Sequence, residues 1–129
     1  MRWARNLERA GVQVVYGFVG FKTHAKVSLV IRREREGAAH KLQSYTHLGT
    51  GNYHAQNAKI YTDLALFTAD PIIGEDVGKL FNFVTSYNKP KRLNKLAIAP
   101  ISLRQTLIEK LITKFNLQEL ESPALSGPR

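Results

Sequence analysis

The chain has 129 residues, of which 43% are hydrophobic, and this is enough for about one domain with a buried core. It contains no cysteine, which excludes disulfides and thiolate metal sites, and neither a signal-peptide core nor an apolar run of ~20 residues is visible, so we expect a cytoplasmic protein. Nineteen Lys and Arg against ten Asp and Glu give a formal net charge of +9, which predicts a polyanionic partner: nucleic acid, an anionic membrane face or a chain of phosphates.

The N-terminal residues follow an α/β pattern. Residues 3–10 carry apolar side chains at helical spacing, and Gly11 is a natural helix stop. Residues 12–16 form a β-branched and aromatic run, which is typical of a buried strand. A helix, a glycine and a strand in this order make half of an α/β unit, so we expect an α/β fold with a mixed sheet flanked by helices.

His24 and Lys26 stand two residues apart at the start of the next apolar run. Side chains on a strand repeat every two residues, so the imidazole and the ammonium should share one face. A neutral imidazole is a nucleophile near neutral pH, and an ammonium offsets the negative charge of phosphoryl oxygens. The pair favours attack on phosphorus, and the plainer alternative is two solvated residues at a strand edge.

Two antiparallel strands are predicted around a charged turn. Residues 26–33 and 42–48 are apolar enough for strands, and residues 32–41 between them are charged, mixed in sign and interrupted by glycine. The loop that follows contains Gly49, Thr50, Gly51 and Asn52. Glycines there would let backbone amides approach an anion, so the loop is either a phosphate-facing loop or a flexible turn.

The remaining elements are predicted from caps and apolar spacing. Residues 59–68 should be extended, and residues 70–87 should form a helix that begins with an Asp-Pro cap. Residues 96–99 are predicted as a short strand and residues 103–115 as a helix. From residue 117 the chain is polar and contains proline and glycine, so residues 117–129 are predicted to be a disordered tail.

Short phrases occur along the chain in an informative order. They are Trp3-Ala4 with Leu7-Glu8 and Ala10-Gly11-Val12, Val15-Tyr16-Gly17, Lys22-Thr23-His24-Ala25-Lys26, His47-Leu48-Gly49-Thr50-Gly51-Asn52-Tyr53, Tyr61-Thr62-Asp63-Leu64, Thr68-Ala69-Asp70 and Leu80-Phe81-Asn82. Together they resemble the bacterial polyphosphate kinase family, from about residue 3 to about residue 112.

The resemblance implies a domain organisation. Residues 1–92 would be part of the first of two phospholipase-D-like catalytic domains, residues 93–116 the connection toward the second, and residues 117–129 an unrelated tail. The family's second domain, with its own catalytic histidine and phosphate-binding arginine, and an arginine-bearing strand before the first helix would both lie outside this chain. We therefore expect an incomplete domain that is very slow on its own.

The resemblance also implies residue roles. The family transfers the terminal phosphate of ATP reversibly to inorganic polyphosphate, and His24 would become the phosphohistidine. Lys26 would be the lysine of the His-x-Lys phrase, and Tyr61 would help to hold the nucleotide. Mg²⁺ is expected because it accompanies ATP, with Asp63 as a secondary candidate for contacting it. ATP or ADP and polyphosphate would be the partners, without a requirement for nucleic acid; peripheral contact with an anionic membrane and a family-like oligomer are compatible with the sequence.

Two other functions compete with the kinase hypothesis. A phospholipase-D-like phosphodiesterase would have an aspartate five residues after the lysine, but Ile31 stands there. A basic polyanion-binding module without catalysis would show salt-sensitive binding that survives loss of His24. The charge also fits a solubility feature, or a piece of a larger protein whose remainder is acidic. His47 and His54 are predicted to be hydrogen-bonded packing residues.

Overall fold

The computed structural model describes residues 2–121. Its elements are α1 (Arg2–Arg9), β1 (Lys26–Glu36), β2 (Ala39–Gly49), the 3₁₀ turn η1 (Asn57–Lys59), β3 (Ala65–Thr68), α2 (Pro71–Ser86) and α3 (Leu103–Glu121). The chain divides into two compact units, Met1–Lys95 and Leu96–Arg129. None of the helices in the described part is long and apolar enough to cross a membrane.

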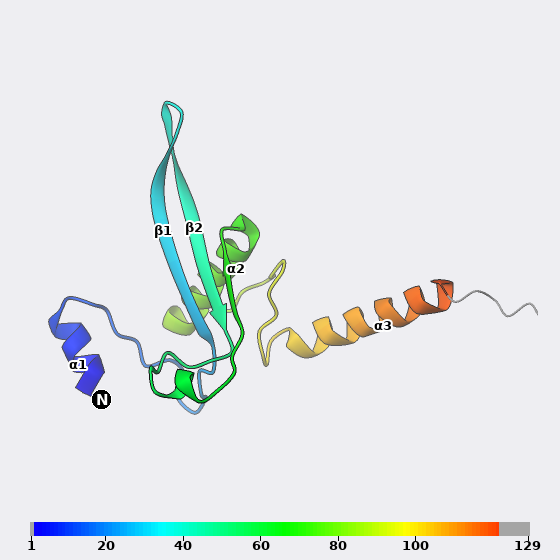
Figure 1. Cartoon of the computed structure of the whole chain (residues 1–129), viewed down its shortest axis with the longest axis horizontal. Coiled ribbons are helices and arrows are strands. Elements are labelled where there is room, and N and C mark those ends of the chain that lie inside the picture. Colours follow the sequence, from blue (N-terminus) through cyan, green and yellow to red (C-terminus); the bar gives the residue numbers. More distant parts are fainter. Residues whose placement is uncertain (1, 122–129) are drawn as a thin grey trace, which may run out of the picture. The chain divides into compact units, whose positions relative to one another are not determined.

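The first unit is built on a three-stranded antiparallel sheet in the order β1-β2-β3 (Figure 1). β1 and β2 pair along their whole length, from Lys26 opposite Gly49 to Glu36 opposite Ala39. β3 pairs only with the last four residues of β2. The two predicted strands are therefore confirmed, and both are longer than expected.

The charged turn predicted at residues 32–41 is wrong in extent. The connection is only Gly37 and Ala38, and Gly37 has a φ of 63°, a conformation that glycine adopts at little cost. The charged residues on either side continue the strands, because opposite charges placed across or along an exposed ribbon attract one another. Local polarity therefore marked the exposure of this segment but not its secondary structure.

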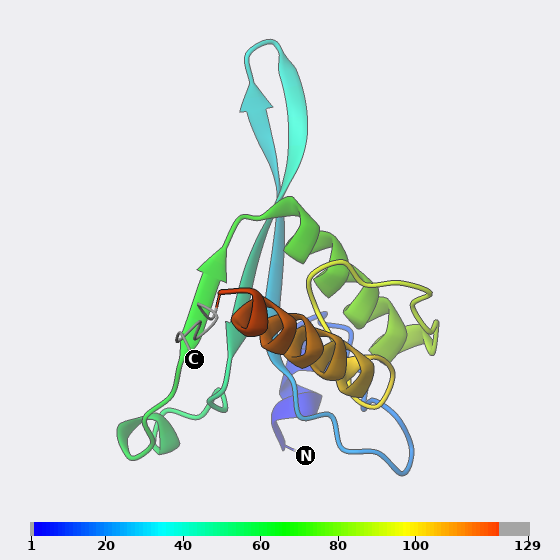
Figure 2. The same ribbon diagram turned by 90° about the vertical axis from the view of Figure 1, so that its right-hand side faces the viewer.

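Helix α2 covers one face of the sheet (Figure 2). Its start follows the sequence prediction: Oδ1 of Asp70 accepts hydrogen bonds from the backbone N–H groups of Ile72 at 2.8 Å and Ile73 at 3.2 Å, and Pro71 occupies the first turn. Val77 is fully buried between helix and sheet. The expected packing of the helix on the two long strands is confirmed.

Residues 12–16 and 96–99 do not form the predicted strands. Among the described residues no strand lies beside residues 12–16, and Tyr16 in that run is 69% exposed. At the second place, the backbone of Ile98 is engaged locally: its N–H donates to Oγ of Ser102 at 3.1 Å, and its carbonyl accepts from the N–H of Ser102 at 2.8 Å. β propensity describes how side chains fit a sheet, but a strand also needs a partner for its backbone.

The sheet and the last helix also differ from expectation. All three described strands are antiparallel, so the mixed sheet is not present in residues 2–121: the parallel member would have come from residues 12–16. Helix α3 continues through Glu121 instead of ending near Phe115. Residues 117–121 of the predicted tail are thus helical, and residues 122–129 lie outside the described residues.

Candidate functional site

The predicted catalytic pair lies in contact at the entrance of β1. Nζ of Lys26 is 3.0 Å from Nδ1 and 3.1 Å from Nε2 of His24, and it donates to the backbone carbonyl of His24 at 3.0 Å. The lone-pair directions of the two ring nitrogens diverge, so an ammonium equidistant from both lies against the ring and not in line with either nitrogen. The carbonyl fixes the cation there.

This arrangement leaves the nucleophilic direction of the ring open. His24 is exposed and precedes the strand, whereas Lys26 is half-buried as its first residue. A phosphorus atom approaching a ring nitrogen in the plane of the imidazole would therefore meet no lysine in its path, while its oxygens would lie near the ammonium. The pair combines an accessible nucleophile with a fixed positive charge.

The glycine loop begins directly beside this pair. Gly49 is the residue of β2 that stands opposite Lys26 in the antiparallel register. The next residue, Thr50, is tied to the β3 side: its N–H donates to the carbonyl of Leu64 at 3.0 Å, and its hydroxyl donates to Oδ1 of Asp63 at 3.0 Å. The register therefore brings the predicted phosphate-facing loop next to the lysine.

The side chain of Asp63 lies close to Gly51. A Cβ on Gly51 would lie 2.4 Å from Oδ2 and 2.5 Å from Cγ of Asp63, so a larger residue cannot enter without displacing the carboxylate. Asp63 therefore braces the loop through its hydrogen bond with Thr50. Among the described residues no group of three His, Asp or Glu side chains could hold a metal ion. Asp63, the secondary candidate for contacting Mg²⁺, has Oδ1 engaged by the hydroxyl of Thr50, and its role toward the metal stays a prediction.

Tyr61 lies just after η1. Its backbone N–H donates to the carbonyl of Asn57 at 3.0 Å, and its side chain is 67% exposed. The ring is consequently accessible to a ligand. Its role in holding a nucleotide stays a prediction.

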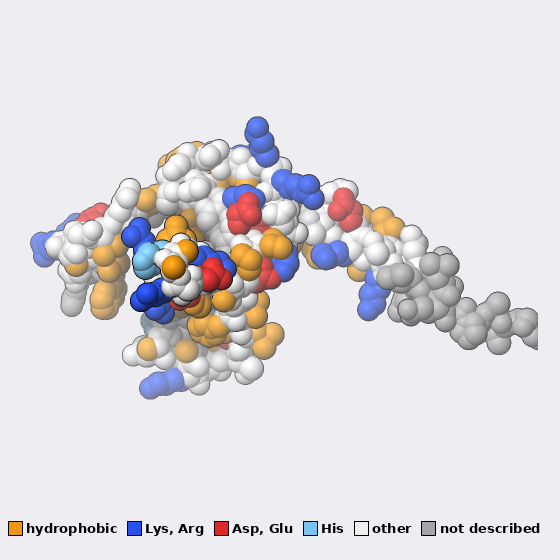
Figure 3. All heavy atoms as spheres, turned by 90° about the horizontal axis from the view of Figure 1, so that it is seen from above, with side chains coloured by type: hydrophobic (Ala, Val, Ile, Leu, Met, Phe, Trp, Pro, Cys, Tyr) orange, Lys and Arg blue, Asp and Glu red, His pale blue; other side chains and the backbone are white. Residues whose placement is uncertain are grey.

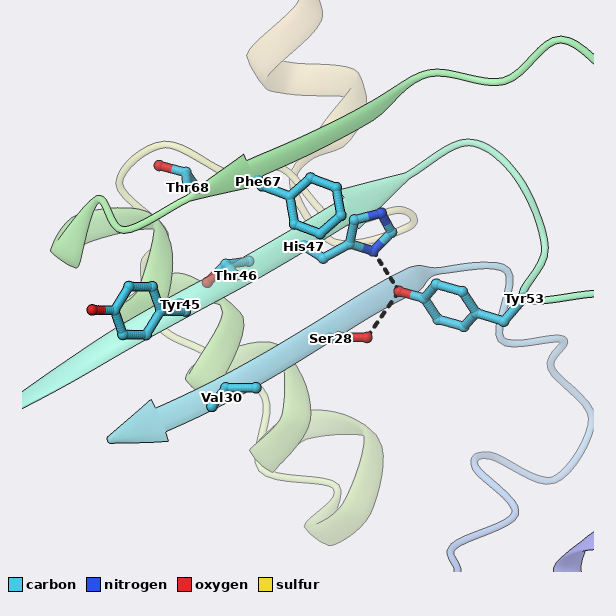
Figure 4. A pocket seen from close by; sticks show the side chains of 8 residues that line it. All are labelled: Ser28, Val30, Tyr45, Thr46, His47, Tyr53, Phe67 and Thr68. Carbon is cyan, nitrogen blue, oxygen red and sulfur yellow. Dashed lines mark hydrogen bonds between the residues drawn. The ribbon is translucent and has the colours of Figure 1, made fainter. Parts of the chain in front are cut away.

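A pocket of about 400 Å³ lies on the sheet face opposite α2 (Figure 4). It is lined by Ser28, Val30, Tyr45, Thr46, His47, Tyr53, Phe67 and Thr68. His24, Lys26 and the glycine loop are not among the lining residues, although Lys26 precedes Ser28 by two positions on the same strand. The pocket thus adjoins the end of the sheet that bears the predicted catalytic pair, without containing that pair.

A hydrogen-bonded network crosses this pocket. The hydroxyl of Tyr53 is 2.6 Å from Nδ1 of His47 and 3.0 Å from Oγ of Ser28 (Figure 4). The ring of His47 also packs on Phe67, with centroids 4.6 Å apart. The sequence analysis did not predict this network. Two signals could have indicated it: Ser28 lies two residues after Lys26 and so should share its face of the strand, and Tyr53 directly follows the glycine loop.

The two other histidines near the loop have structural partners, as predicted. His47 is bonded and packed as described above. Nδ1 of His54 accepts a hydrogen bond from the backbone N–H of Asn57 at 3.2 Å, which supports the start of η1. In both histidines, Nδ1 already has a hydrogen-bond partner within the protein.

Comparison with known proteins gives concordant matches. Residues 1–90 match the family described as Polyphosphate kinase C-terminal domain 1. The polyphosphate kinase of Erythrobacter litoralis is 62% identical over 105 residues, covering 81% of this chain and 14% of that protein. The polyphosphate kinase of Parasynechococcus marenigrum is 47% identical over 114 residues, 88% of this chain and 15% of that protein. That of Streptomyces coelicolor is 44% identical over 124 residues, 96% of this chain and 16% of that protein.

The extent of these matches has two consequences. The matched segment is a small part, 14% to 16%, of each of these three relatives. The identity is far above the level at which chance or fold alone could account for it, and the phrases around His24 and the glycine loop fall inside residues 1–90. The chain therefore belongs to the polyphosphate kinase family.

Proposed function

We propose that this chain supplies the phosphate-carrying histidine of a polyphosphate kinase. A ring nitrogen of His24 attacks the terminal phosphorus of ATP, the bond from that phosphorus to the bridging oxygen breaks, and ADP leaves with the electron pair. A terminal oxygen of polyphosphate then attacks the phosphohistidine, and the nitrogen–phosphorus bond breaks. Two in-line steps thus replace one direct transfer between two anions.

The contact between His24 and Lys26 is the observation that carries this proposal. Phosphoryl transfer depends mainly on positioning and on compensation of charge at the phosphoryl oxygens. An ammonium held 3.0 Å from the backbone carbonyl of His24 is already placed for that purpose. It does not lie in line with either nitrogen, so it need not move away before the attack.

The neighbouring segments would hold the rest of the substrate. The loop from Gly49 to Asn52 starts opposite Lys26, and backbone amides in such a glycine-rich turn suit phosphate oxygens. The exposed ring of Tyr61 would contact the nucleotide. Magnesium would arrive with the phosphates of ATP, and Asp63 would be the carboxylate to contact it. A phospholipase-D-like fold of the complete catalytic half, peripheral membrane contact and an oligomer belong to this proposal as well.

We further propose that the isolated chain binds polyphosphate but makes little of it. The relatives that it matches are several times longer, so the full reaction would use groups from other parts of such an enzyme. Binding needs positive charge but no catalytic step, and the chain has a net charge of +9. A pure polyanion-binding module predicts the same binding, but it predicts no covalent phosphate on His24.

The decisive experiment is incubation with radiolabelled ATP and magnesium. The protein is then scored for acid-labile phosphate, and the modified residue is located by mass spectrometry. We expect labelling that His24→Ala abolishes and that the matched control His54→Asn retains, because His54 has only a structural contact. Labelling at another residue would refute the role of His24, and absence of any label on an intact, folded chain would favour the binding module. Robust polymer formation by the chain alone would refute the need for other parts.

A further inference from the structure

The outer part of the β1–β2 hairpin projects beyond the rest of the sheet. β3 pairs with β2 only from Thr46 to Gly49, and the closest approach of α2 at Gly74 is to Ser44. Residues 32–36 and 39–43, which we call the hairpin arm, continue beyond the paired part of β3 as a two-stranded ribbon (Figures 1 and 2). Its base is attached to the body, because Nε2 of Gln43 donates to the carbonyl of Ala69 at 2.9 Å. A bare two-stranded ribbon adds little stability in water, so the arm is a surface available for contacts.

One face of the arm is electrically balanced. It carries Arg32, Glu34 and Glu36 from β1, with Lys41 across from Glu34. Arg32 lies 3.9 Å from Glu34, and Lys41 lies 4.0 Å from Glu36. The hydroxyl of Tyr45 donates to Glu34 at 2.6 Å, and this hydrogen bond to the carboxylate raises the pKa of Tyr45. Each cation on this face therefore has an acidic neighbour.

The opposite face carries positive charge and no acid. Alternation along the strands places Arg33 and Arg35 there, with Leu42 opposite the first and His40 opposite the second. In the described part of the chain neither arginine forms an ion pair; Nε of Arg35 donates to the carbonyl of Gly37 at 3.2 Å. Figure 3, which looks down on the arm, shows basic and histidine side chains beside one another at its projecting end. Two basic residues directly opposite each other in a ribbon repel when both are charged, unless an anion lies over them.

We propose that this second face, which we call the cationic face, binds a linear polyphosphate chain. Arg33 and Arg35 are about 6.8 Å apart along one strand, and each guanidinium can hold phosphate oxygens through two parallel hydrogen bonds. A linear anion without bases needs only such a row of donors. Single-stranded nucleic acid usually also needs aromatic rings on which successive bases stack, and this face carries no Phe, Tyr or Trp and offers the imidazole of His40 alone. The apolar Leu42 lies toward the body and not at the tip, which disfavours insertion into a lipid surface.

This inference rests on the proposed function for the identity of the polymer, but its test needs no catalysis. The full chain is titrated with fluorescently labelled linear polyphosphate over a series of salt concentrations. The test variant is Arg33→Gln with Arg35→Gln. The matched control is Arg32→Gln with Lys41→Gln, which removes the same charge from the same arm on the balanced face. Circular dichroism and melting curves establish that both variants keep the fold of the parent.

The two variants should behave differently. Loss of the cationic face should weaken binding at low salt at least tenfold and reduce the slope of log K against log salt by about 1.5, since each released phosphate contact contributes roughly 0.7–0.9. The control should change affinity less than about twofold. Equal losses in both variants would mean that only net charge matters and would overturn the inference.

Other probes separate the alternatives. The parent chain and the Arg33 and Arg35 variant are also titrated with an oligothymidylate and with anionic phosphatidylserine vesicles. If the variant loses affinity for one of these probes and not for polyphosphate, the arm binds nucleic acid or membrane, and the proposal is overturned. Covalent phosphate on His24 reports the proposed function separately, and the Arg33 and Arg35 variant should keep it. Polyphosphate binding that is insensitive to this variant, with His24 still labelled, would overturn the arm proposal alone.

Discussion

Two glycines of α2 should respond in opposite directions to alanine. A Cβ added at Gly74 would lie 2.6 Å from Cβ and 3.2 Å from Oγ of Ser44, whereas a Cβ at Gly78 would meet nothing within 4 Å. In a helix interior alanine is favoured over glycine by about 0.5–1 kcal/mol, and overpacking a close contact costs about 1–3 kcal/mol. Gly78→Ala should therefore raise the free energy of unfolding by about 0.5–1 kcal/mol, and Gly74→Ala should lower it by about 1–2 kcal/mol.

A double-mutant cycle identifies the partner. Ser44→Gly removes both atoms that the new methyl group would meet, so in that background Gly74→Ala should become stabilising by about 0.5–1 kcal/mol. Urea unfolding followed by circular dichroism gives each free energy. A Gly74→Ala variant as stable as Gly78→Ala would refute the close packing of α2 on β2. A cost that persists in the Ser44→Gly background would place the clash elsewhere.

Three further predictions concern carboxylates and the loop. The hydrogen bond from the ammonium of Lys95, and then those from the backbone amides of the first turn of α2, lower the pKa of Asp70. The resulting stabilisation is present above the unfolded pKa of about 3.9 and is lost as the pH falls through the lower folded pKa. Asp70→Ala should therefore lower Tm at pH 6 and much less at pH 2. Asp76 is fully buried and accepts from the backbone N–H of Lys95 at 2.7 Å, so Asp76→Ala should lower the free energy of unfolding by about 3 kcal/mol in urea titrations, and an unchanged midpoint would contradict its burial. Gly51→Ala should abolish most labelling by ATP while changing Tm little, because the methyl group displaces Asp63 in an exposed loop; full labelling would show that the loop is not used.

The elements that sequence analysis predicted well have local causes. The start of α2 depends on Asp70 and on the proline that follows it, and both act on the backbone within one turn. β1 and β2 are adjacent in the chain and need only a two-residue turn to pair. In each case the group that stabilises the element lies within a few residues of it, so the pattern of side chains is sufficient.

The failures have a different origin. Residues 12–16 have strong β propensity, but the described residues provide no neighbouring strand, and Phe18 beyond them packs on Phe83 of α2 with ring centroids 4.8 Å apart. Residues 96–99 do not form a strand, because the backbone of Ile98 is hydrogen-bonded to Ser102 in a turn. Propensity could not reveal either outcome, because each depends on which partner the backbone finds.

The residues of the candidate site also include some that sequence analysis could bring together and some that it could not. The sequence marked His24 and Lys26 as a pair, and the structure brings them into contact. The expected reason is wrong, because β1 begins at Lys26 and His24 precedes it, so the two residues do not share one face of a strand. The contact depends instead on the ammonium of Lys26, which reaches back to the carbonyl of His24. The bond between Ser28 and Tyr53 joins residues 25 positions apart, and no short motif encodes such a pairing. Asp63 illustrates an intermediate case: its phrase in the sequence marked it for attention, but only the hydrogen bond with Thr50 shows that it braces a loop.

The tethers of the glycine loop explain how a largely exposed site can keep its geometry. Thr50 is held from the β3 side by Asp63, and Tyr53 is held from the sheet by His47 and Ser28. Both tethers end on or beside paired strands, so they restrict motion of the loop relative to Lys26. His24, in contrast, lies before β1 and is held mainly by its contact with Lys26. This asymmetry suits the proposed function. Under that proposal the loop would bind the anion and should be preorganised, since electrostatic stabilisation acts only through dipoles already in place, whereas His24 would have to turn from one substrate to the other.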